Sequence, residues 1–154
     1  KGRDLKGVCD AMGQWGARWL EIEPHHLDPA YVLWATTKLV DVSRLPDRTV
    51  VVRFDMRDKP AEHYWLILRR PHPELCTRGL GHVEDIVVST DSGCLVDIHL
   101  TRTSYAEAIR QGRLLLAGPP QLVRAFPTWI RHSPFAGATP GTAEARRRET
   151  SAQP

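Results

Sequence analysis

The chain has 154 residues, 42% of them hydrophobic and 25% charged, which is the composition of a globular protein with room for one domain and short appendages. Its 21 basic residues are nearly balanced by 18 acidic ones, so the charge does not by itself indicate nucleic-acid binding. No apolar run approaches the roughly 20 residues that a transmembrane helix needs, and we expect no stable membrane association.

The first residue and the cysteines bear on the cellular context. The chain begins with Lys1 rather than Met and has no signal-peptide pattern, so we expect a piece of a longer, cytoplasmic protein. Cys9, Cys76 and Cys94 have no CxxC spacing, which argues against a disulfide framework and a structural zinc site. We therefore expect reduced thiols, no metal and no cofactor.

The first regular apolar pattern lies near the N-terminus. It consists of side chains three or four residues apart: Leu5, Val8, Met12, Trp15, Trp19 and Ile22. This spacing predicts one helix with a single apolar stripe, although each interior glycine costs it on the order of 1 kcal/mol relative to alanine. Such a helix needs a packing partner, either a second subunit or the rest of this chain. Met12, Trp15 and Trp19 are the candidate dimer-interface residues.

A second helix and a sheet are expected next. Asp28-Pro29 is typical of a helix start, and that helix is expected to run to about Val40. The runs TVVVRFDMR and EHYWLILRR, joined by the polar turn RDKP, predict two antiparallel strands. With shorter strands at residues 74–77 and 85–89, they predict a four-stranded antiparallel meander.

Two short helices are expected after the meander. Thr90 or Asp91 can cap the first of them, which continues to His99. Ser104 can cap the second, at residues 105–111, where Gly112 has the position of a C-terminal glycine.

The rest of the chain predicts one strand and one helix. The strand is expected at residues 114–116, and Pro119-Pro120 begins a last helix that Pro127 kinks or ends. Residues 136–154 contain no aliphatic side chain larger than alanine. We expect this tail to be disordered, because it cannot bury enough surface to offset its ordering entropy.

Two stretches of the sequence resemble known families. KGRDL followed by QWGARWL resembles the end of the winged helix-turn-helix domain of HxlR-type regulators, where the wing leads into a dimerisation helix. The run from DIVVSTDSG to HSPFA resembles the sterol-carrier-protein domain appended to some of those regulators. The matching positions are Asp91, Leu95, Ser104, Ala108, Gly112 and Gly118. Thr101, where that family commonly has glycine, and Gly93 depart from the pattern.

The resemblance implies a fold and a domain organisation. The fold class is α+β, with an antiparallel sheet of about five strands covered by helices and preceded by a long N-terminal dimerisation helix. Residues 1–23 would be the remnant of the winged-helix domain, residues 24–135 a sterol-carrier-like ligand-binding domain, and residues 136–154 the tail. DNA would be bound only through the missing N-terminal winged helix.

A sterol-carrier-like fold also implies an apolar cavity between the sheet and its helices, the usual form of a small-molecule site. Six candidates for its lining come from the predicted strands and helices: Trp34, Phe54, Trp65, Ile67, Leu95 and Ile98. Taken singly, each of them is better explained as ordinary core, because a half-buried sheet covers its apolar face with or without a ligand.

Patterns for catalysis and metal binding are weak. The chain has no GxSxG turn, and Cys94 and His99 are five residues apart, which does not place them on one helix face. His72, Cys76 and His82 have no fixed ligand spacing. We therefore expect no catalytic residue, no metal ligand and no enzymatic activity.

Two functions follow as hypotheses. The first is a non-enzymatic regulatory module of a bacterial transcription regulator, which forms a homodimer and binds an apolar or amphipathic small molecule that modulates DNA binding. The alternative is a free-standing sterol-carrier-like protein that binds and transfers lipids. The dimer-like first helix favours the regulator, whereas an exposed apolar helix near residues 126–135 would favour the carrier.

Overall fold

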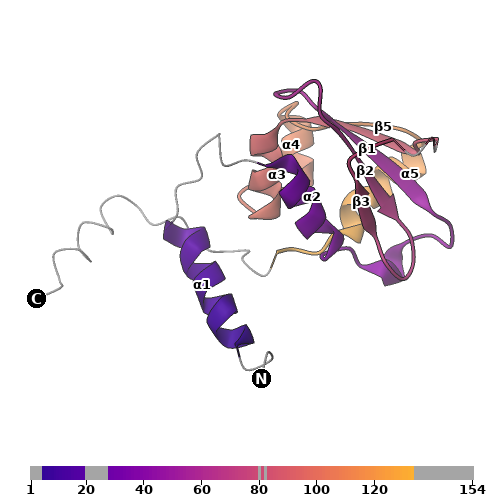
Figure 1. Ribbon diagram of the computed structural model, residues 1–154. Coiled ribbons are helices and arrows are strands. Elements are labelled where there is room, and N and C mark those ends of the chain that lie inside the picture. Colours follow the sequence, from indigo (N-terminus) through magenta and orange to yellow (C-terminus); the bar gives the residue numbers. More distant parts are fainter. Residues whose placement is uncertain (1–4, 20–27, 80, 82, 134–154) are drawn as a thin grey trace, which may run out of the picture.

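The computed structural model describes residues 5–19, 28–79, 81 and 83–133 of the chain. Helix α1, at Lys6–Trp19, stands apart from a sheet that is covered by the remaining helices (Figure 1). Within the described ranges, no helix has the length and apolar character needed to cross a membrane. The expected tail, residues 136–154, lies outside these ranges.

The sheet has five strands in the order β3-β2-β1-β4-β5. The strands are β1 at Val50–Met56, β2 at His63–Leu68, β3 at Glu74–Cys76, β4 at Ile86–Thr90 and β5 at Leu115–Ala117. Neighbouring strands are antiparallel except β1 and β4, which run parallel, with Val52 opposite Ile86. The α+β class with five strands is confirmed, but the antiparallel meander is wrong at the fourth strand, because the sheet is mixed.

The connection between β3 and β4 explains this difference. A parallel neighbour cannot be reached by a tight hairpin, and the chain instead crosses one face of the sheet before it enters β4. Gly79 passes so close to the Trp65 ring that a Cβ on the glycine would lie 3.2 Å from it. At the end of the crossing, Asp85 accepts a hydrogen bond from Val51 N–H at 2.9 Å and so fixes the start of the parallel pairing.

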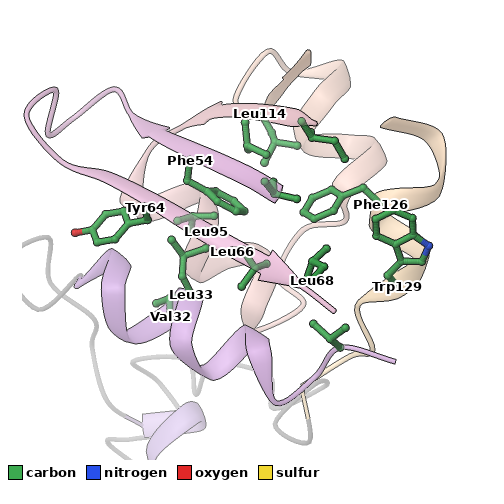
Figure 2. Packing of buried hydrophobic residues seen from close by; sticks show 14 of the residues in the cluster. Val32, Leu33, Phe54, Tyr64, Leu66, Leu68, Leu95, Leu114, Phe126 and Trp129 are labelled. Atoms are coloured by element: carbon green, nitrogen blue, oxygen red, sulfur yellow. The ribbon is translucent and has the colours of Figure 1, made fainter. Parts of the chain in front are cut away.

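The core lies on the opposite face of the sheet, beneath the helices. Alternate residues of β1 and β2 supply it, because successive side chains of a strand point to opposite faces: Val50, Val52, Phe54, Met56, Tyr64, Leu66 and Leu68. Figure 2 shows Phe126 and Trp129 packed beside these strands. The Phe126 ring is 6.4 Å from Phe54 and 6.3 Å from Trp129 between centroids, within the range of favourable aromatic pairs.

The helix starts agree with the capping expectations. Helix α2, at Pro29–Thr37, is capped by Asp28, and α3, at Ser92–His99, by Asp91 rather than Thr90. Ser104 caps α4, at Tyr105–Arg110. Gly112 follows α4 with a φ of +69°, a conformation that favours glycine at a helix end.

One helix end differs from expectation for a tertiary reason, and another agrees with it. Helix α2 ends at Thr37 instead of near Val40, because Val40 leaves the helix to form a β-bridge with Ile130. Helix α5, at Pro120–Ala125, gives way to the 3-10 helix η3 at Phe126–Trp129. Pro127 has no N–H for a continuing α-helix, so the last helix changes type there.

Candidate ligand-binding site

A cavity of about 580 Å³ lies between α2, α3, the start of α4 and the segment that follows η3. Its apolar wall comes mainly from the helices, and β1 contributes Phe54. The main apolar residues are Val32, Leu33, Phe54, Leu95, Ile98 and Tyr105. Figure 2 shows Val32 and Leu33 on α2, with Phe54 and Leu95 in the same cluster. The volume and the mostly apolar lining are typical of small-molecule sites.

Three of the six sequence candidates meet at this cavity, namely Phe54, Leu95 and Ile98. Trp34 does not line it. The Trp34 side chain is 50% exposed on α2, beside the Tyr31 ring at 5.9 Å and beneath the Lys38 ammonium group at 5.4 Å.

Trp65 and Ile67 also lie away from the cavity, so the prediction that they line it is wrong. The register of β1 and β2 pairs Trp65 with Arg53 and Leu66 with Val52. Since cross-strand partners point to the same face, Trp65 and Ile67 point away from the helices. The polar character of Arg53 was the signal in the sequence that could have identified this face.

The loop that joins α3 to α4 brings polar residues to the cavity wall. Arg102 N–H donates to Asp97 O at 2.8 Å, and Thr101 N–H donates to Ile98 O at 3.0 Å. This pair of hydrogen bonds is the Schellman motif, whose turning residue has a left-handed backbone and is usually glycine. Here the turning residue is Thr101, with a φ of +56°. The departure noted in the sequence therefore falls on a backbone conformation that threonine rarely adopts.

His99, the last residue of α3, lines the cavity together with Thr101 and Thr103 of this loop. Within the described residues, the buried His99 Nδ1 and Thr103 Oγ1 have no hydrogen-bond partner, whereas Thr101 Oγ1 donates to Leu100 O at 2.7 Å. Burial lowers the pKa of His99, because desolvation disfavours the charged imidazolium. The imidazole is therefore neutral at neutral pH. No sequence pattern identifies His99 and Thr103 as wall residues, because tertiary packing sets the path of this loop.

The cavity reaches the surface among charged side chains. Arg44, in the 3-10 helix η2 at Val42–Arg44, lies 3.5 Å from the Asp41 carboxylate. A hydrogen bond from the Ser43 side chain holds the pKa of Asp41 below its usual value. Arg131 and His132 are exposed at the same rim. Exposed charged side chains therefore border the cavity, and the hydroxyl groups of Thr36, Thr128 and Ser133 add to the polar residues near the α3–α4 loop in an otherwise mostly apolar lining.

The candidate dimer residues lie on α1. Leu5, just before α1, and Val8, Met12 and Trp15 on α1 are 60%, 55%, 68% and 60% exposed, so the described part of the predicted apolar stripe faces solvent. Ile22, the last residue of that stripe, lies outside the described residues. The side chain of Trp19 lies outside the description.

Among the described residues, no three His, Cys, Asp or Glu side chains are placed to share a metal ion, and His82 lies outside the description. Cys94 is buried, and burial raises the pKa of its thiol.

Comparison of the sequence with known protein families finds no match. Comparison with curated proteins finds none either.

Comparison of the structure with solved structures does find neighbours. The chain is similar to the sterol carrier protein domain 2 of Helicoverpa armigera, with a TM-score of 0.54, 13% identity, and coverage of 70% of this chain and 88% of that chain. It is also similar to palmitated sterol carrier protein 2 like 2 of Aedes aegypti, with a TM-score of 0.50, 18% identity, and coverage of 66% and 89%. The domain therefore has a sterol-carrier-protein-2-like fold.

A third neighbour is a much longer enzyme. The stereoselective inverting sec-alkylsulfatase of a Pseudomonas species matches with a TM-score of 0.59, 19% identity and coverage of 71% of this chain. The match spans only 17% of the alkylsulfatase chain. The same fold therefore occurs both as most of a small carrier protein and as a minor part of an enzyme, and fold alone does not assign an activity.

Proposed function

We propose that the sheet domain binds an apolar or amphipathic small molecule, of the lipid class, and catalyses no reaction on it. The observation that carries this proposal is the cavity of about 580 Å³ with its apolar wall. The palmitated Aedes aegypti neighbour supports it, since a protein of the same fold has been solved with a fatty acyl group. Burial of apolar ligand surface would supply most of the binding free energy.

The proposal can be tested with a variant whose larger side chain fills the cavity, by measuring how tightly that variant binds a fatty acid. Ile98 lines the cavity and is partly buried, so Ile98→Trp would place an indole in the ligand's volume. We expect the Kd for palmitate, measured by displacement of the neutral dye Nile red, to rise about tenfold or more. Leu115→Trp is the matched control, because Leu115 is 52% exposed on an edge strand outside the cavity. Equal affinities for both variants and the parent, with unchanged melting temperatures, would refute the cavity as the site.

The exposed stripe of α1 favours one context for this binding. Several large apolar side chains that face solvent on one side of a helix are typical of an interface, and a 14-residue helix is marginal in isolation. We propose that α1 pairs with α1 of a second copy, and that the domain is the regulatory module of a DNA-binding protein in which ligand binding shifts the geometry of the dimer. DNA contacts would come from a winged helix that precedes α1.

Sedimentation equilibrium tests the pairing. We expect the parent chain to be a dimer and the Met12→Gln, Trp15→Gln double variant to be a monomer. The matched control is Gln14→Ala with Asp10→Ala, which changes two residues of the same helix outside the stripe. A parent chain that is monomeric at tens of micromolar concentration would refute the pairing.

The alternative, a lipid carrier, remains a separate proposal with its own test. The aromatic residues that would have supported it, Phe126 and Trp129, are 0% and 4% exposed, so they do not form an exposed membrane-active surface. A carrier should move a fluorescent fatty acid between vesicle populations at a rate proportional to protein concentration. A ligand-sensing module should bind the same fatty acid without accelerating its exchange.

A further inference from the structure

The outer face of α2 carries two exposed aromatic side chains. Tyr31 and Trp34 are 65% and 50% exposed and lie one helical turn apart, with their ring centroids 5.9 Å from each other. The other exposed large apolar side chains described in the sheet domain lie singly on separate segments: Val83, Ile109 and Leu115. Single exposed apolar residues are ordinary, whereas adjacent Tyr and Trp side chains are typical of a protein–protein contact. The outer face of α2 is therefore the strongest candidate for such a contact in this domain.

Two charged residues flank the aromatic pair. Asp28 and Lys38 are exposed at the N-terminal and C-terminal ends of α2. The four residues follow one another at steps of three or four and so form one row along the helix, which we call the α2 stripe: Asp28, Tyr31, Trp34 and Lys38. The Lys38 ammonium group lies 5.4 Å from the centroid of the Trp34 ring. The α2 stripe therefore has an acidic end, an aromatic middle and a basic end.

This order makes the α2 stripe complementary to itself. Asp28 lies five residues before Leu33 and Lys38 five residues after it, with Tyr31 and Trp34 between them. If two copies of α2 pack antiparallel about a two-fold axis near Leu33, each Asp28 faces the partner's Lys38, and the aromatic pairs face each other. A parallel arrangement would instead bring like charges together. The charges therefore favour an isologous antiparallel contact, in which both copies use the same surface.

The α2 stripe is free for this contact because α2 uses its other face inside the domain. Val32, Leu33 and Thr36 are buried and line the cavity. A stable interface buries roughly 800 Å² per partner, which is more than four side chains of a nine-residue helix can supply. A contact at α2 therefore needs a further contact, and α1 precedes α2 in the chain by only eight residues, 20–27.

We propose that the α2 stripe packs antiparallel against the α2 stripe of a second copy, so that the dimer has a contact at α2 in addition to the one at α1. The proposal rests on the proposed pairing of two copies through α1, and it adds a second contact and its direction. Tyr31 and Trp34 supply the apolar area, and two symmetric pairs of Asp28 with the partner's Lys38 set the direction. The contact lies on the back of the helix that forms a wall of the cavity.

Sedimentation equilibrium of the full 154-residue chain tests the aromatic part of the contact. The double variant Tyr31→Gln, Trp34→Gln should raise the Kd of the dimer about tenfold or more, because aromatic anchors carry much of the binding energy of an interface. The matched control is Ile109→Gln with Leu115→Gln, which removes two exposed apolar side chains elsewhere and should leave the Kd unchanged. Melting temperatures followed by circular dichroism verify that all variants are folded.

Charge variants test the direction of the packing. Lys38→Glu should weaken the dimer about three- to tenfold at low ionic strength, because repulsion replaces attraction at two symmetric pairs. Asp28→Asn keeps an oxygen that can cap α2, and it should weaken the parent dimer but strengthen the Lys38→Glu dimer. This reversal requires that the two side chains meet. Within one chain they lie at opposite ends of α2, about 15 Å apart, so the meeting must occur between copies.

The possible outcomes separate this inference from the pairing on which it rests. An unchanged dimer Kd in the Tyr31→Gln, Trp34→Gln variant would overturn the α2 contact, while a monomeric Met12→Gln, Trp15→Gln variant would uphold the pairing through α1. Strengthening of both dimers by Asp28→Asn would overturn the antiparallel direction. An unchanged dimer together with lost binding to vesicles of phosphatidylcholine and phosphatidylserine would assign the α2 stripe to a membrane surface and overturn the inference. A monomeric parent chain would overturn the inference and the pairing together.

Discussion

The two faces of the sheet differ in how their polar side chains are paired. On the face crossed by the β3–β4 connection, Arg53 lies 3.0 Å from Asp55 and 3.5 Å from Glu84. Trp65 Nε1 donates to Glu84 at 3.2 Å. On the helix-covered face, the loop at the cavity leaves His99 and Thr103 without partners. The crossed face holds its polar side chains in ion pairs and hydrogen bonds, although Arg53 Nε itself forms only the ion pair with Asp55. The two polar atoms on the other face have neither kind of partner, and an unpaired buried polar atom costs stability.

The largest expected effect lies where the core meets the cavity. Phe126 is fully buried and packs against Phe54, Tyr105 and Trp129. Phe126→Ala should lower the free energy of unfolding by about 3–5 kcal/mol, because it removes a large buried side chain and leaves a void. Urea unfolding followed by circular dichroism measures this change. A loss below about 1 kcal/mol would mean that the aromatic cluster is loosely packed.

The second effect probes the opposite face. Trp65→Phe keeps an aromatic ring beside Gly79 but removes the hydrogen bond to Glu84, which is the main cause of the lowered pKa of that carboxyl. We expect a loss of about 1–2 kcal/mol of unfolding free energy at pH 7. Glu84→Gln, which retains an acceptor oxygen, should lose less. If Trp65→Phe is neutral, the polar network on this face is not stabilising and the comparison of the faces fails.

Thr103→Val tests the opposite case on the cavity loop, which is the removal of a buried hydroxyl that has no partner. Removing a buried hydroxyl that has no partner relieves a desolvation penalty, so the unfolding free energy should stay constant or rise by up to about 1 kcal/mol. Thr36→Val, which removes a hydroxyl bonded to Val32 O, should be less favourable. Destabilisation of Thr103→Val by more than the Thr36 variant would indicate that Thr103 has a partner in solution.

The backbone of the same loop can be tested for a conformation that lowers the stability of the folded chain. Thr101 adopts a φ of +56°, which costs an L-residue roughly 1–2 kcal/mol relative to its preferred regions. Thr101→Gly should therefore raise the unfolding free energy by up to about 1 kcal/mol, after the entropy cost of glycine and the lost hydroxyl bond to Leu100 O are included. Gly93→Ala, within α3, is the comparison variant. An unstable Thr101→Gly protein would show that the threonine side chain supports the loop.

Features that depend on neighbouring residues in the chain could be predicted from the sequence. Features that depend on contacts between distant segments could not. Asp28, Asp91 and Ser104 were identified as helix caps because a cap depends on its neighbours in the chain. The parallel pairing of β4 with β1 depends on a crossing loop and left no periodic signal. The cavity residues divide in the same way into those that the sequence pattern predicts and those that only tertiary structure reveals. Phe54 follows from strand alternation, whereas the polar wall depends on how one loop turns at Thr101.

The smallest expected effect is a pH dependence of the unfolding free energy, which His99 on the helix-covered side causes. Because burial lowers the pKa of His99 in the folded chain below its ordinary value of 6.5, the unfolded chain takes up a proton first as the pH falls. The contribution of His99 is therefore complete above about pH 6.5 and is lost as the pH falls towards the folded pKa. The parent chain should lose more unfolding free energy between pH 7.5 and 5.5 than His99→Phe does, as measured by urea unfolding at both values. His132→Gln, at the exposed rim, should follow the parent. If the parent and His99→Phe show the same pH dependence, the imidazole is solvated in the folded chain, and burial does not lower its pKa.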